Sequence, residues 1–114
     1  MKDNYEANAK IMKALSDPSR LKIMDILSCG ELCACDILEH FDFTQPTLSH
    51  HMKVLMECGL ILCRKEGLWS YYSLNGVNCS KLILFLMGII TETDECVCKN
   101  KNKNECNKGV ASNE

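Results

Sequence analysis

The chain has 114 residues, of which 46% are apolar and 25% are charged, with a formal net charge of −2 at pH 7. These values are ordinary for one small soluble domain with a modest core. They exclude a protein that binds nucleic acid through overall positive charge, so any such contact must come from local clusters of basic residues.

Nine cysteines are many for a chain of this length. A secreted disulfide scaffold is disfavoured, because the number is odd and residues 1–6 contain no apolar signal-peptide segment. The longest apolar run, residues 82–90, is far shorter than the ~20 residues that span a bilayer. We therefore expect a cytoplasmic protein with no membrane partner, whose thiols act as ligands, redox sensors or buried core residues.

Apolar spacing and start signals predict four helices in the first half of the chain. They cover residues 5–15, 18–28 and 45–57, with a short third helix within residues 31–41. Asp17 is expected to cap the second helix and Thr44 the fourth, each with a proline in the first turn.

The second half begins with two predicted strands, residues 60–66 and 69–74, which form a hairpin that turns at Gly67 and Leu68. A last predicted helix, residues 79–93, is apolar on nearly every side. Such a helix must be buried on more than one face, so we expect it to pack against a second copy in a homodimer.

This order of elements is typical of a winged helix-turn-helix. We predict a mainly α fold with four helices, a β-hairpin wing and a C-terminal dimerisation helix. Residues 1–93 are expected to form the DNA-binding and dimerisation domain. Residues 94–114 are rich in Lys, Asn and Cys, which predicts a flexible tail.

Polar side chains occupy the outward positions of the fourth predicted helix, and basic ones precede the tip of the hairpin. Amide, hydroxyl and amine groups suit base edges and phosphates. The candidate DNA contacts are Gln45, Thr47, Ser49, His50, Lys53, Arg64 and Lys65. Neighbouring residues of a helix point about 100° apart, so His50 and His51 are not expected to chelate one ion. The expected partner is a roughly palindromic double-stranded operator.

Two thiols, Cys33 and Cys35, lie at the expected start of the third helix. The helix dipole there favours thiolate. Residues two apart on an ideal helix point about 200° apart, so both thiolates can face one ion only if the first turn distorts. We expect that distortion to move the neighbouring DNA-reading helix and to release the operator.

The tail repeats this spacing at Cys96 and Cys98, with Cys106 further on. We expect these thiols to form a second soft-ion site or to add ligands to the first. No nucleophile and base are placed as catalysis needs, so an enzyme is not expected. Three kinds of sensor remain possible. Three thiolates suit a sensor of a trivalent metalloid, and four suit a sensor of Cd(II), Pb(II) or Zn(II). A thiol-redox sensor would instead oxidise to a disulfide without any metal.

Two segments resemble the ArsR/SmtB metal-responsive repressors, in particular those of arsenical-resistance operons. These segments are residues 31–38, ELCACDIL, and residues 45–51, QPTLSHH, within a likeness that covers about residues 5–93. The resemblance implies a dimeric winged-helix repressor that leaves its operator when As(III) or Sb(III) binds as inducer.

The resemblance also implies that Cys33 and Cys35 are two thiolates of a three-thiolate site. The third position of that site falls on Leu38, which carries no sulfur. We therefore expect the third ligand to come from the tail of either subunit, from Cys96, Cys98 or Cys106.

Overall fold

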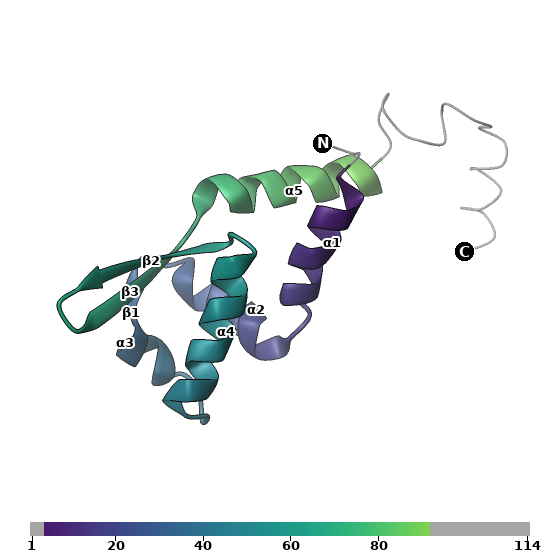
Figure 1. Ribbon diagram of the computed structural model, residues 1–114. Coiled ribbons are helices and arrows are strands. Elements are labelled where there is room, and N and C mark those ends of the chain that lie inside the picture. The colour runs from purple at the N-terminus through teal and green to yellow at the C-terminus, as the bar shows by residue number, and fades with distance from the viewer. Residues whose placement is uncertain (1–3, 92–114) are drawn as a thin grey trace, which may run out of the picture.

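The computed structural model describes residues 4–91. Its elements are α1 (Tyr5–Ala14), α2 (Pro18–Leu27), β1 (Leu32–Cys33), α3 (Ala34–Leu38), α4 (Gln45–Glu57), β2 (Ile61–Glu66), β3 (Trp69–Leu74) and α5 (Gly76–Ile90). Figure 1 shows the β2–β3 hairpin projecting from one side, while α1 and α5 meet at the other side. The predicted tail, with its three cysteines, lies outside the described residues.

The fold is mainly helical with a small antiparallel sheet, which confirms the predicted winged helix-turn-helix. Helices α3 and α4 and the turn between them form the helix-turn-helix, and strands β2 and β3 form the wing (Figure 1). Gly67 at the wing tip has a φ of +62°, a left-handed conformation that glycine adopts without strain. None of the helices within residues 4–91 has the length and apolar character needed to cross a membrane.

The core lies where α2, α3 and α4 meet the base of the sheet. On α4, spacings of four and three residues place Leu48, Met52 and Leu55 on the buried side. The contiguous core cluster consists of Ile23, Leu27, Ile37, Leu48, Met52, Leu55, Leu60, Ile61 and Leu82. Because α4 is anchored along this one stripe, its opposite side is free to face a ligand.

Local signals place the ends of the helices that frame this core. Asp17 caps α2 as predicted, since its carboxylate accepts a hydrogen bond from the backbone N–H of Arg20 at 3.1 Å. Thr44 occupies the N-cap position of α4, although its side chain makes no capping hydrogen bond within the described structure. In the turn before α4, the rings of Phe41 and Phe43 stack with centroids 4.5 Å apart.

Strand β1 is absent from the sequence prediction. Leu32 and Cys33 pair with Tyr72 and Tyr71 of β3, so β3 lies between β1 and β2. Two residues are too few to produce the alternating pattern by which a strand is recognised. The short third helix predicted within residues 31–41 is α3, and it begins after Cys33.

The last helix also begins earlier than predicted, at Gly76 rather than at residue 79. The side chain of Asn75 accepts a hydrogen bond from the backbone N–H of Asn78 at 3.2 Å and so caps the first turn. Asn75 and Gly76 therefore start the helix instead of only ending the hairpin.

Candidate DNA interface and thiol site

The seven candidate DNA contacts are all exposed. Five of them lie on α4, opposite its buried stripe or at its N-terminal end, and two lie on β2 in the wing: Gln45, Thr47, Ser49, His50, Lys53, Arg64 and Lys65. The geometry brings polar groups of the helix and basic groups of the wing to the surface of one small domain. Their contacts with DNA stay predictions.

Arg64 is held by protein groups rather than left free on the wing. Its guanidinium donates hydrogen bonds to both carboxylate oxygens of Glu31, at 2.9 and 3.1 Å, and pairs with Glu66. It also lies 4.7 Å from the ring centroid of Tyr71. The hydrogen bond from Arg64 lowers the pKa of the Glu31 carboxyl, and the two carboxylates raise the pKa of Arg64.

These contacts give Arg64 a structural duty that its sequence position did not reveal. They connect the wing to the loop before β1, and Cys33 is only two residues beyond Glu31. Lys65, by contrast, takes part in neither of the ion pairs found within residues 4–91. Lys65 is therefore the more accessible cation for a phosphate.

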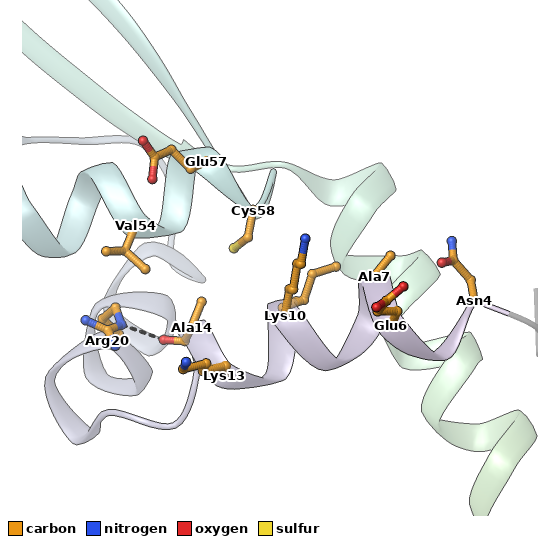
Figure 2. A pocket seen from close by; sticks show the side chains of 11 residues that line it. Asn4, Glu6, Ala7, Lys10, Lys13, Ala14, Arg20, Val54, Glu57 and Cys58 are labelled. Carbon is orange, nitrogen blue, oxygen red and sulfur yellow. Dashed lines mark hydrogen bonds between the residues drawn. The ribbon is translucent and has the colours of Figure 1, made fainter.

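A second connection positions α4 from its inner side. The Arg20 guanidinium lies 3.0 Å from Nδ1 of His51. It also donates a hydrogen bond to the backbone carbonyl of Ala14 (Figure 2). Burial lowers the pKa of His51. The positive charges of Arg20 and His50 act in the same direction, whereas Asp17 opposes them. Arg20 therefore braces the end of α1 against α4.

The brace lies beside an open groove of about 680 Å³ between α1 and the C-terminal end of α4 (Figure 2). Lys10, Lys13 and Glu57 line it together with one thiol, Cys58. Burial raises the pKa of that thiol, whose sulfur lies 3.3 Å from the carbonyl of Leu55. A single protonated thiol is a poor ligand for a soft ion, so this groove is not the expected chelate.

The predicted thiol pair occupies the junction of β1 and α3. Cys33 is buried and has the extended conformation of an N-cap residue, with φ −80° and ψ 158°. Cys35 is exposed in the first turn of α3. The structure joins the two as a disulfide with Cα atoms 5.5 Å apart. Both sulfurs and a carboxylate oxygen of Asp36 lie within 4.8 Å of one another.

This arrangement overturns the predicted distortion of the helix. The expectation that the two sulfurs can meet only if α3 distorts is wrong, because Cys33 belongs to β1 and precedes the helix. The turn from strand to helix already brings the sulfurs together. Cys33 pairs with Tyr71 of β3, so the thiol pair is joined to the wing as well as to the helix-turn-helix.

A helix-turn-helix with a polar outer face, followed by a β-hairpin wing, defines a DNA-binding transcriptional regulator and not an enzyme. The chain belongs to the ArsR family. Residues 17–62 match the family model described as "Bacterial regulatory protein, arsR family". Family membership is shown by a relative that is similar over almost its whole length.

That relative is an arsenical resistance operon repressor of Staphylococcus aureus, 52% identical over 103 residues, which cover 90% of this chain and 99% of the relative. A cadmium resistance transcriptional regulatory protein CadC homolog of the same species is 42% identical, covering 72% of this chain and 69% of its own. Among solved structures, a homodimeric winged helix-turn-helix domain from Mycobacterium bovis is 29% identical with a TM-score of 0.62, covering 72% of this chain and 76% of its own. The chain is accordingly an ArsR-family transcriptional repressor.

Proposed function

We propose that this repressor binds operator DNA as a homodimer and that As(III) or Sb(III) releases it by binding to thiolates. Cys33 and Cys35 supply two of these thiolates. The similarity to an arsenical resistance operon repressor supports the class of inducer. The homodimeric neighbour and the apolar surface of α5 support the dimer.

The observation that carries the proposal is the meeting of two sulfurs at the entrance to the helix-turn-helix. Soft thiolate ligands suit a soft trivalent metalloid. An ion held there contacts β1 and α3 together, so its binding changes the junction through which the wing and α4 are positioned. Release then comes from altered placement of the DNA-contacting elements, with no unwinding of α3.

The third ligand is proposed to come from Cys96, Cys98 or Cys106, in the segment beyond the described residues. Replacing each of these by Ser in the full chain, followed by counting of arsenic–sulfur bonds by X-ray absorption, identifies it. Loss of one sulfur in a single variant names the ligand. An unchanged count in all three variants contradicts a tail ligand.

The main experiment measures release from a labelled operator fragment selected from random duplexes. Arsenite is titrated into the reduced full-length protein, and fluorescence anisotropy reports the bound DNA. The double variant Cys33→Ser with Cys35→Ser is expected to bind the operator normally and to lose release. A matched control, Cys29→Ser with Cys63→Ser, removes two exposed thiols at other places and should keep both properties.

Two alternatives are separated in the same titration. Asp36 adds an oxygen donor near both sulfurs, and a cadmium resistance regulator homolog is among the relatives, which favours testing Cd(II). The Cys33–Cys35 disulfide favours testing peroxide as a metal-free signal. Release by peroxide without release by arsenite under reducing conditions would overturn the metalloid proposal.

A further inference from the structure

A cavity of about 300 Å³ lies beside Cys35, and the metalloid site proposed above leaves it unused. Three elements form its walls: Leu38 comes from α3, Gln45 from the start of α4, and Leu68 and Trp69 from the tip of the wing. No charged side chain lines the cavity within the described part of the chain. It therefore suits an uncharged and partly apolar group.

Hydrocarbon, and no second thiol, faces Cys35 across the cavity within the described residues. Leu38 follows Cys35 by three residues on α3, a spacing that places both side chains on one side of a helix, and both line the cavity. Cys35 is the one sulfur-bearing residue of that lining in the described structure. An arsenic atom held by Cys33 and Cys35 thus meets hydrocarbon in this direction instead of a third thiolate.

We propose, on the basis of the function proposed above, that this cavity receives the organic substituent of a trivalent arsenical. Arsenic(III) forms three bonds. In a compound R–As(OH)₂ carbon supplies one of them, so the thiolates of Cys33 and Cys35 complete the set without any further ligand. The site would then bind a class of inducers in which a carbon group replaces one hydroxyl of arsenite.

The binding step is a ligand exchange. Two As–S bonds form while two As–O bonds break, and the two thiol protons leave with the hydroxides as two molecules of water. Arsenic stays trivalent and no electron is transferred. A disulfide between Cys33 and Cys35 must first be opened by a phosphine reductant, which is oxidised to the phosphine oxide with oxygen from water as the two thiols form.

The cavity is large enough for an aromatic ring, since an apolar cavity of about 150 Å³ already binds benzene. Trp69 is 57% exposed and Leu68 is fully exposed, so both offer apolar surface that a ring would cover. These walls belong to the wing and to the start of α4. A ring placed there contacts both DNA-contacting elements, and we expect it to release the operator at lower concentration than arsenite does.

The test compares phenylarsine oxide with arsenite in calorimetric titrations of the full chain, reduced with a phosphine. Trp69→Ala is expected to weaken binding of phenylarsine oxide about tenfold and to leave binding of arsenite unchanged. Leu62→Ala is the matched control, because Leu62 is an exposed apolar residue of β2 that does not line the cavity. Trp69 is the single tryptophan of the chain, so its fluorescence also reports a ring bound at the wing.

A second variant, Leu38→Cys, places a thiol on the cavity wall and is expected to shift preference from phenylarsine oxide toward arsenite. The inference is overturned if Trp69→Ala changes both affinities by one factor or changes neither. If arsenite releases the operator while phenylarsine oxide does not bind, the cavity inference falls and the proposed function stands. If neither compound binds, the proposed function itself fails.

Discussion

His51 lies on α4, the helix proposed to contact DNA, but its side chain makes a contact within the protein. Its neighbour His50 is exposed, whereas His51 faces inward and lies 3.0 Å from the guanidinium of Arg20 through Nδ1. Neutral His51 can accept a hydrogen bond from Arg20 at this nitrogen, while the protonated ring cannot. The protonation state of this residue therefore decides whether the brace from α1 to α4 holds.

The brace predicts that operator affinity falls in acid. Burial holds the His51 pKa below its ordinary value of about 6.5, so the unfolded chain takes up this proton first as the pH falls. The contribution of neutral His51 to the stability of the fold is fully present above about pH 6.5 and is lost as the pH falls through the lowered pKa. The brace that positions α4 is lost over the same range. Anisotropy titrations of the operator between about pH 5 and 8 measure the expected loss of operator affinity.

Two variants separate this effect from direct contact with DNA. His51→Gln keeps an acceptor for Arg20 and removes the titration, so it should bind normally at neutral pH and lose less affinity in acid. His40→Gln, a change at an exposed histidine outside the interface, should follow the unmodified protein. Tighter binding in acid that His51→Gln abolishes would contradict the brace, since it would mean that protonated His51 meets a phosphate.

The two thiols of Cys33 and Cys35 lie on either side of an element boundary. The spacing of Cys33 and Cys35 was sufficient to nominate them, because a one-residue gap allows two thiols to meet. The helical geometry applied to the pair was wrong, since Cys33 lies in β1. A pattern within one element cannot reveal that an element boundary falls between two residues.

In the wing, Arg64 makes protein contacts that the sequence did not predict, and its contact with DNA stays a prediction. Both basic residues of β2 were expected to contact DNA. Arg64 is paired with Glu31 and Glu66 and lies over Tyr71, whereas Lys65 takes part in neither ion pair found within residues 4–91. Glu31 lies 33 residues from Arg64 in the chain, so no local pattern could have identified this partner.

Salt dependence distinguishes these basic residues. Each phosphate contact contributes about 0.9 to the slope of log affinity against log salt concentration. Lys53→Ala and Lys65→Ala are each expected to weaken operator binding and to reduce the slope by about one contact. Arg64→Ala should reduce the slope less, because two carboxylates balance its charge.

The converse result would change the assignment of the wing. A full one-contact loss of slope in Arg64→Ala, with no loss in Lys65→Ala, would mean that Arg64 leaves Glu31 when DNA binds. Glu31→Gln is the matched variant for that case. It weakens the ion pair without altering the basic residues, and it should then tighten operator binding.

At the scale of the whole molecule, α5 is incompletely covered by a single copy of the chain. Leu82 and Phe85 are buried, while Ile83, Leu84 and Met87 are each more than half exposed. So much apolar surface on one helix is typical of a protein–protein interface. This surface is the main structural support for the proposed homodimer, together with the homodimeric neighbour from Mycobacterium bovis.

A charge on this surface is expected to separate the proposed dimer. Leu84→Glu should lower the association constant of the dimer at least about tenfold, because a carboxylate would have to be buried in an apolar interface. Lys81→Glu, an exposed polar position of the same helix, is the control for a change of charge alone. Analytical ultracentrifugation measures both, and operator anisotropy should show weakened binding in Leu84→Glu alone. A Leu84→Glu protein that stays dimeric would place the interface elsewhere.

The amino-acid sequence was sufficient to predict the helices to within a few residues at their ends, the Asp17 cap, the wing, the polar face of α4 and the spacing of the thiols. These features depend on neighbours within a few residues, and periodicity and capping express that local physics directly. Four features became visible only in the folded chain: the Arg20–His51 brace, the pairing of β1 with β3, the Glu31–Arg64 contact and the cavity beside Cys35. Each of these joins residues of different elements, and packing of the core, not local propensity, sets which of them meet.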